Sequence, residues 1–179
     1  MIARPFPTPE RLKQLLRYDA ETGKLYWRPR ARDMFPTQRA FSTWAAQFTD
    51  QEALTALNYG YRVGRVDGKN CAAHRVIWAI VHGSWPAELD HVNGHRDDNR
   101  LTNLREANRS QNLCNRPMPA ANTSGHKGVY FHKPTEKWRA QIKKNGVSHF
   151  LGCFGNLDDA IAARLSASLR LHGEFARAA

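Results

Sequence analysis

Residues 89–112 read LDHVNGHRDDNRLTNLREANRSQN, and this stretch decides how the chain is interpreted. It is dense in side chains that bind metal ions or phosphates, with an Asp-His pair near its start and an asparagine at its end. Hydrolysis of a phosphodiester needs a cation against the developing charge, a base for water, and a scaffold that holds both. The residue types in this stretch are suited to each of these tasks.

The first two candidate functional residues are Asp90 and His91. A carboxylate is a hard oxygen ligand for a divalent cation, and histidine is the natural base near neutral pH. Neighbours on a strand point to opposite sides, so both can serve one site only if the strand ends or bends, as the Asn93-Gly94 turn allows. An isolated Asp-His pair is usually an ordinary turn or surface pair, so the interpretation depends on the whole spaced set.

The order and spacing of this set resemble the HNH endonuclease motif of the ββα-metal fold, with Asn103 and Asn112 following His91. The flanking runs AHRVIW at residues 73–78 and DNRLTNLR at residues 98–105 resemble the phage HNH subfamily especially. The resemblance spans roughly residues 59–116. The earlier run LLRYDAETGKLYW also resembles a segment common near the N-terminus of these phage proteins.

The resemblance implies a role for each matching residue. His91 would be the general base, and Asp90 and Asn112 would bind a single Mg²⁺ or another divalent cation. Asn103 would tie the loop between two strands in a structural role. With Asn103 included as a supporting member, we expect the catalytic set to be Asp90, His91, Asn103 and Asn112.

Composition points to a polyanionic partner. The chain of 179 residues carries a net charge of +11 at pH 7, and 41% of it is hydrophobic. Its longest strongly apolar stretch, residues 76–81, is far short of the roughly 20 residues that a membrane span needs. The N-terminus lacks the apolar core of a secretory signal, and three widely spaced cysteines suit a reducing compartment. We therefore expect a cytoplasmic protein that binds nucleic acid and no membrane, and the resemblance to HNH endonucleases implies that this partner is double-stranded DNA.

The elements expected in the N-terminal part are a helix over residues 8–18 and a strand over residues 23–27. Residues 30–58 show too little periodicity to assign. A strand over residues 62–66 enters a turn at Asp67-Gly68, and a short buried helix covers residues 74–82 before Gly83. A further strand is expected over residues 101–105 and a short helix over residues 110–116.

The C-terminal part shows the sharpest pattern. In KWRAQIK at residues 137–143 every second residue is apolar, which is typical of a half-buried antiparallel strand. Asn145-Gly146 predicts a hairpin turn, a strand precedes over residues 128–132, and a helix follows over residues 157–171. The expected unit is a three-stranded sheet covered by one helix. Its basic residues are concentrated in the sheet half, as in proteins whose sheet enters the major groove.

This part resembles the APETALA-two type DNA-binding domain of plant ethylene-response factors, over about residues 124–175. The resemblance implies that the sheet reads the major groove with Tyr130, His132, Lys137, Arg139, Gln141 and Lys143. Trp138 is expected on the buried face by alternation alone. The predicted fold class is α+β, with an N-terminal segment at 1–58, a nuclease domain at 59–116, a linker at 117–124 and a DNA-binding domain at 125–179.

Several residues keep alternative interpretations. His95 is a possible substitute base, whereas His74 and Asn99 are expected to be structural. The basic residues near the motif either clamp phosphate or form a solvated face; they are Arg100, Arg105 and Arg109.

The sequence therefore predicts that the chain is a metal-dependent endonuclease of homing type that nicks or cuts DNA at preferred sites. Its main rival is a non-catalytic, sequence-specific DNA-binding regulator, with an RNA-binding protein as a weaker alternative.

Overall fold

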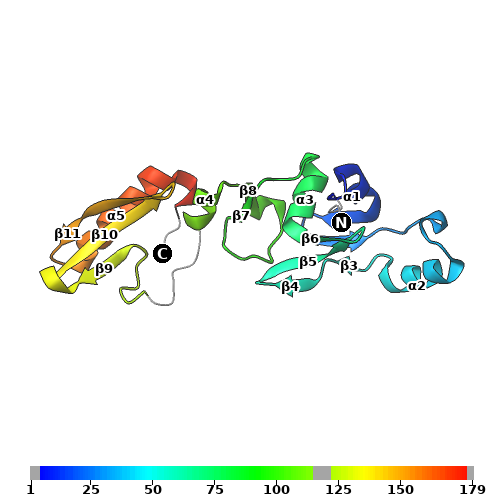
Figure 1. Ribbon diagram of the computed structural model, residues 1–179, viewed down its shortest axis with the longest axis horizontal. Coiled ribbons are helices and arrows are strands. Elements are labelled where there is room, and N and C mark those ends of the chain that lie inside the picture. The colour runs from blue at the N-terminus through cyan, green and yellow to red at the C-terminus, as the bar shows by residue number, and fades with distance from the viewer. Residues whose placement is uncertain (1–4, 115–121, 177–179) are drawn as a thin grey trace. The chain divides into compact units, whose positions relative to one another are not determined.

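The computed structural model describes residues 5–114 and 122–176, in helices and small antiparallel sheets (Figure 1). This mixture agrees with the α+β class that the sequence predicts. Contacts divide the chain into two compact units, Met1–Glu106 and Ala107–Ala179, each with a hydrophobic core. Residues 1–58 thus share a unit with the residues that follow them, and most of the predicted linker lies outside the described residues. Within the described ranges, no helix has both the length and the apolar character required to cross a membrane.

The first helix is shorter than its sequence predicts. α1 (Pro9–Leu15) begins as expected, with the Thr8 hydroxyl accepting a hydrogen bond from the backbone N–H of Arg11 at 3.2 Å. It ends at Leu15 instead of residue 18, because Leu16 opens strand β1 (Leu16–Asp19), which pairs with β2 (Lys24–Trp27). Each strand has a leucine buried in the core, Leu16 in β1 and Leu25 in β2. Pairing between the strands therefore overrides the helical pattern of the sequence after Leu15.

Residues 30–58, which the sequence leaves unassigned, contain four short elements. They are η1 (Arg32–Met34), α2 (Gln38–Phe48), β3 (Glu52–Ala53) and β4 (Ala56–Asn58). The aromatic ring of Trp44 on α2 lies 6.3 Å from that of Trp27, centroid to centroid, and 5.8 Å from that of Phe48. β3 pairs with β2, giving the sheet order β1-β2-β3. The segment is thus held by contacts with distant residues.

The next sheet and helix agree with the sequence. β4 pairs with β5 (Tyr61–Val66), and β5 pairs with β6 (Lys69–Ala72) through the predicted turn, where Asp67 and Gly68 have φ of 46° and 78°. α3 (Ala73–His82) follows and ends at Gly83, whose φ of 73° is the left-handed conformation that terminates many helices.

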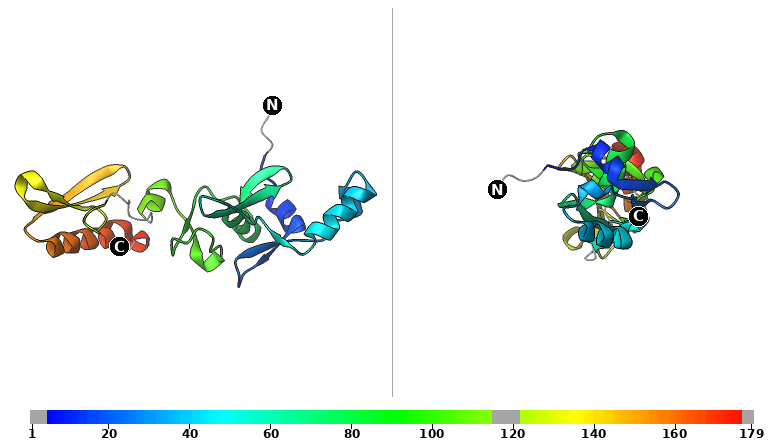
Figure 2. Two further views of the ribbon diagram at one scale, coloured as in Figure 1. Left: turned by 90° about the horizontal axis from the view of Figure 1, so that it is seen from below. Right: turned by 90° about the vertical axis from the view of Figure 1, so that its right-hand side faces the viewer.

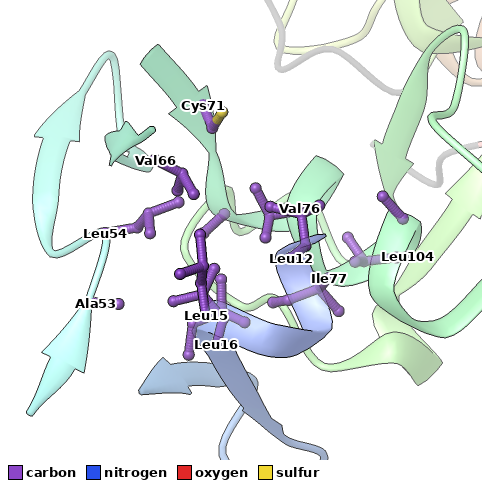
Figure 3. Close-up of a cluster of buried hydrophobic side chains, with 13 residues drawn as sticks. Leu12, Leu15, Leu16, Ala53, Leu54, Val66, Cys71, Val76, Ile77 and Leu104 are labelled. Carbon is purple, nitrogen blue, oxygen red and sulfur yellow. The ribbon is translucent and has the colours of Figure 1, made fainter. Parts of the chain in front are cut away.

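The core of this unit joins α1 to α3 (Figure 3). Val76 and Ile77 of α3 are completely buried, as are Leu12 and Leu15 of α1. Further buried side chains come from the three sheets of this unit and from the turn after β3; they include Leu16, Leu25, Ala53, Leu54, Val66, Cys71 and Leu104. Because α3 depends on leucines from the start of the chain, the N-terminal segment is part of the same folded body.

The second unit contains α4 (Arg109–Cys114), a sheet and a long helix. The strands β9 (Val129–His132), β10 (Lys137–Lys144) and β11 (Val147–Phe154) have the order β11-β10-β9, with η3 (Lys133–Thr135) between the first two. α5 (Leu157–His172) lies along one face of this sheet and is followed by η4 (Gly173–Phe175), as the yellow-to-red part of Figure 2 shows. The predicted sheet of three strands under one helix is confirmed.

Candidate active site

The residues of the motif lie on a short antiparallel pair in the first unit. β7 (Leu89–His91) pairs with β8 (Leu104–Glu106), and η2 (Leu101–Asn103) precedes β8. The predicted strand over residues 101–105 is therefore wrong in its first half, because the chain must turn there to close the loop between β7 and β8. Opposite partners in this pair include Asp90 with Arg105 and His91 with Leu104.

Asn103 closes the loop between β7 and β8. Its side-chain oxygen accepts a hydrogen bond from the backbone N–H of Asn93 at 2.9 Å, and its side-chain nitrogen donates to the backbone oxygen of Asp98 at 2.8 Å. The backbone oxygen of Asn103 also accepts from the N–H of Val92 at 2.9 Å. These contacts are of the kind that the family resemblance implies for Asn103, and its importance for activity stays a prediction.

His91 is buried, with 5% of its surface exposed. Its Nε2 lies 3.1 Å from the side-chain oxygen of Asn99, itself 1% exposed. Burial lowers the pKa of His91, although the hydrogen bond to Asn99 and the charge of Asp90 oppose that shift. A lowered pKa favours the neutral ring at neutral pH, and only the neutral ring can accept a proton.

A second imidazole lies beside the first. The ring of His74, at the start of α3, is 5.1 Å from that of His91 and 5.2 Å from that of Tyr61, centroid to centroid. Burial lowers the pKa of His74 to about 3, and the neighbouring His91 and Arg75 add to the effect. His74 is therefore uncharged at neutral pH and packs against the ring of His91, and its structural role stays a prediction.

Asp90 is 7% exposed and is paired with a cation. Its Oδ2 accepts hydrogen bonds from Nη2 of Arg105 at 2.8 Å and from Nε of the same guanidinium at 3.0 Å. Sequence reasoning missed this pair, because it treated Arg105 as a phosphate clamp or part of a solvated face. Arg100 is the more exposed of the two arginines, and it pairs with Asp98 at 2.6 Å.

The remaining member of the set, Asn112, lies on α4, which belongs to the second compact unit. The structure thus gathers Asp90, His91 and Asn103 on one hairpin. Arg109, the other arginine near the motif, is exposed at the start of α4. The predicted helix over residues 110–116 begins at Arg109, and its last predicted residues lie outside the described part.

The chemistry of the proposed ligands fits a divalent cation. Asp90 supplies a carboxylate that already attracts a positive charge, and Asn112 supplies a carboxamide oxygen, both hard ligands of the kind that Mg²⁺ prefers. Across residues 5–114 and 122–176, no three His, Cys, Asp or Glu side chains cluster as they would in a metal site built from those residues alone.

Residues 71–114 match the family model described as HNH endonuclease. The chain is 33% identical over 106 residues to Protein 3.8 of Escherichia phage T7. The aligned region covers 58% of this chain and 87% of that protein. The chain belongs to the HNH endonuclease family. It is also 31% identical over 121 residues to the uncharacterized HNH endonuclease L560 of Acanthamoeba polyphaga mimivirus, over 65% of this chain and 61% of that protein. No solved structure gives a significant match.

The second unit of this HNH endonuclease presents an open sheet face. Lys137 pairs with His132 and Arg139 pairs with Tyr130, so these side chains share one side of the sheet. By the same alternation, the predicted DNA-contacting set lies on this side: Tyr130, His132, Lys137, Arg139, Gln141 and Lys143. Ala140 and Ile142 are buried on the side of α5, and Trp138 packs there against Phe131 and the core.

The open face has two features that the sequence did not predict. The ladder is irregular between Ala140 and Gln141, which introduces an extra residue into β11. The guanidinium of Arg139 lies 5.0 Å from the ring of Phe150, so an aromatic residue that was not in the predicted set shares the face. The family match ends before residue 125, and the DNA-contacting role of this sheet remains a prediction.

Proposed function

We propose that this HNH endonuclease is a metal-dependent enzyme of homing type that hydrolyses phosphodiester bonds of DNA, with His91 as the general base. The observation that carries the proposal is the buried pair on β7, where Asp90 is ionically bound and the pKa of His91 is lowered. A carboxylate and a neutral imidazole on adjacent residues offer a cation ligand and a proton acceptor beside each other. A protein that only binds DNA has no need of this combination.

Asp90 and Asn112 would hold one Mg²⁺ or another divalent cation. Such a cation supplies positive charge to the phosphate and to the departing 3′ oxygen. Asn112 comes from α4, which follows β8 after Ala107 and Asn108, and its assignment to the metal rests on the spacing of the motif. Asn103 would act indirectly, by keeping the loop closed.

His91 would accept a proton from water as that water attacks phosphorus. The bond between phosphorus and the 3′ oxygen then breaks, and the departing oxygen takes a proton from solvent water, which leaves a 5′-phosphate and a 3′-hydroxyl. The neutral state of His91 supports this role, because a ring with a lowered pKa is ready to accept a proton at neutral pH. A base of this kind typically accelerates a reaction by about 10²- to 10⁴-fold.

The open face of the second unit would supply the site preference. Residues 125–150 contain six Lys or Arg residues and one acidic residue, and the basic side chains on β10 alternate toward the open face. A sheet of this size fits the major groove of DNA, where its side chains can reach base edges. We propose that Tyr130, His132, Lys137, Arg139, Gln141 and Lys143 contact DNA there.

A non-catalytic DNA-binding regulator is the alternative function. One observation favours it: Arg105 already neutralises Asp90, as in a purely structural ion pair. In that case the hairpin would be a scaffold, and the open sheet would do all the DNA binding. The two functions differ in whether purified protein cuts DNA at all.

The test is cleavage of supercoiled plasmid by the full-length chain, with and without Mg²⁺ and a chelator. We expect nicked or linear products only with the metal, and a loss of about 10²- to 10⁴-fold in His91→Ala with DNA affinity nearly unchanged. Asp97→Asn, at an exposed position of the same loop, is the matched control and should cut normally. Cleavage by His91→Ala within a few-fold of the unmodified protein would assign the base to another group, such as His95.

The metal ligands are tested by titrating Mg²⁺ in the same assay. Asp90→Ala and Asn112→Ala should each need more Mg²⁺ for half-maximal cleavage, or lose activity, because each removes an oxygen ligand from a site with few of them. Curves that coincide with that of the unmodified protein would remove both residues from the proposed site.

A further inference from the structure

We infer that Asn99 is a positioning residue that holds His91 in the tautomer with the proton on Nε2, which leaves Nδ1 to accept the proton of the attacking water. The inference rests on the proposed role of His91 as the base. The sequence alone predicts a structural role for Asn99. The inference gives Asn99 the further role of orienting His91, and it identifies Nδ1 as the ring nitrogen that accepts the proton.

The hydrogen bond between the two side chains carries the inference. Nε2 of His91 lies 3.1 Å from Oδ1 of Asn99, and a carboxamide oxygen can only accept a hydrogen bond. The ring nitrogen that faces it must therefore carry the proton. A neutral imidazole has one N–H, so its lone pair is then on Nδ1.

Burial keeps this bond from exchanging with water. Asn99 is 1% exposed and His91 is 5% exposed, so bulk solvent offers little replacement for the acceptor at Oδ1. In the other tautomer the buried Oδ1 of Asn99 would lose its hydrogen-bond donor and face the lone pair of Nε2, and this costs free energy. The choice of tautomer is thus fixed before any substrate arrives.

The β1–β2 hairpin holds the backbone around Asn99 in place. The Tyr18 hydroxyl accepts a hydrogen bond from the N–H of Leu101 at 2.9 Å and is 3.5 Å from the backbone oxygen of Asn99. Gly23 approaches so closely that a Cβ there would be 2.6 Å from the backbone N of Arg100 and 2.8 Å from the carbonyl carbon of Asn99. The side-chain oxygen of Asn99 therefore projects from a fixed point.

Two aromatic rings restrict the orientation of the imidazole. His74 meets the ring of His91 edge to face, with centroids 5.1 Å apart and an interplanar angle of 70°. Tyr61 lies 5.8 Å from His91, and the guanidinium of Arg96 is 5.0 Å from the Tyr61 ring. With neighbours on its faces and an acceptor at Nε2, the ring has one preferred orientation as well as one preferred tautomer.

The tautomer is read directly by ¹⁵N NMR of the histidine rings in the full-length protein, without metal or DNA. His91→Gln identifies the signals of His91 by their disappearance. At a pH where this ring is neutral, we expect the proton on Nε2 and an unprotonated Nδ1. In Asn99→Leu, which has similar size and no acceptor, the signals should report a mixture of tautomers. Asn99→Asp retains an acceptor oxygen and should restore the Nε2-protonated form.

Cleavage kinetics supply the second readout. Asn99→Leu should lower kcat for plasmid nicking by about 10- to 100-fold, the usual effect of losing a group that orients an active-site histidine. KM and the affinity for DNA should stay nearly constant, and rescue by the conservative variant separates this effect from a loss of folded protein. Asn99→Asp should recover most of the rate, and Asp97→Asn, the exposed neighbour, should match the unmodified protein.

The outcomes separate this inference from the proposed function. A proton on Nδ1 in the unmodified protein, or unchanged kcat in Asn99→Leu, would overturn the role of Asn99. An Nε2-protonated ring in a protein that fails to cut DNA with any divalent cation would instead overturn the proposed function. If Asn99→Leu does not fold, the unmodified protein and Asn99→Asp still decide the tautomer: both must show the proton on Nε2.

Discussion

Asp90 and Arg105 face each other across the β7–β8 pair, and one carboxylate oxygen of Asp90 accepts two hydrogen bonds from the guanidinium, at 2.8 Å and 3.0 Å. Both side chains are largely buried, with 8% of the aspartate and 17% of the arginine exposed. A cation that binds Asp90 must therefore share the carboxylate with Arg105 or displace it. The ion pair and the proposed metal site compete for the same carboxylate.

Arg105→Met should lower the free energy of unfolding by about 3 kcal/mol in the absence of metal, because it leaves a buried carboxylate without its cation. Urea unfolding with and without Mg²⁺ measures this, and Mg²⁺ should stabilise the variant more than the unmodified protein. Arg100→Met is the matched control: its pair with Asp98 involves a half-exposed arginine and should contribute no more than about 1 kcal/mol. Equal losses in the two variants would contradict the prediction.

Asn103→Ala should lower the free energy of unfolding by about 2 kcal/mol. The substitution leaves the N–H of Asn93 and the backbone oxygen of Asp98 without their partners in a half-buried loop. Urea denaturation gives the value, with the exposed Asp97→Asn as the reference for a harmless change in the same loop. Unchanged stability would mean that the loop closes without this side chain.

Stability should fall as the solution is made acidic from neutral pH, before most carboxylates titrate. Burial lowers the pKa of His74 from 6.5 in the unfolded chain to about 3 in the folded protein, so the unfolded state binds the proton first. This contribution is fully present above pH 6.5 and is lost progressively as the pH falls toward 3. By pH 5 the expected loss from this one group is about 2 kcal/mol.

His74→Phe keeps an aromatic ring beside Tyr61 and removes the titrating group. Its unfolding free energy, measured by urea denaturation between pH 7 and pH 5, should depend less on pH than that of the unmodified protein. Parallel curves would mean that His74 has the same pKa in the folded and the unfolded protein.

Lys143→Ala should weaken DNA binding by about tenfold, whereas Lys144→Ala should have a much smaller effect. The two lysines are adjacent on β10 and alternate between its faces, with Lys143 on the open side. Lys144 lies toward α5, where its charge, after burial and Arg164, helps to lower the pKa of His172. Fluorescence anisotropy with a duplex gives both affinities, and equal losses would show that the open face is not the specific contact surface.

Local patterns made much of the fold predictable. The alternation over residues 137–143 and the Asn145-Gly146 turn specify a hairpin by themselves, and both glycine and asparagine adopt positive φ there. Gly83 likewise marks the end of α3. Leu15 and Leu16 were ambiguous, because two adjacent buried leucines suit a helix or a strand equally well, and only pairing with β2 decides.

The contacts within the active site depend on tertiary structure and were not predictable. The pairing of Asp90 with Arg105 follows from the register of β7 and β8, which a spacing alone does not specify. The bond from His91 to Asn99 requires the loop to fold back over eight positions of sequence. Motif spacing thus predicted the candidate residues Asp90 and His91, whose catalytic roles stay predictions, whereas the partners of their side chains required the folded structure.

The packing of α1 on α3 has a practical consequence for engineering. The family match begins at residue 71, which invites the use of residues 71–114 as a transplantable cleavage cassette. Such a cassette would omit Leu12 and Leu15, and Val76 and Ile77 would lose the apolar surface that covers them. It would also omit Tyr18, which braces the loop that contacts His91 through Asn99. A graft of this nuclease into another protein should therefore start at the first helix.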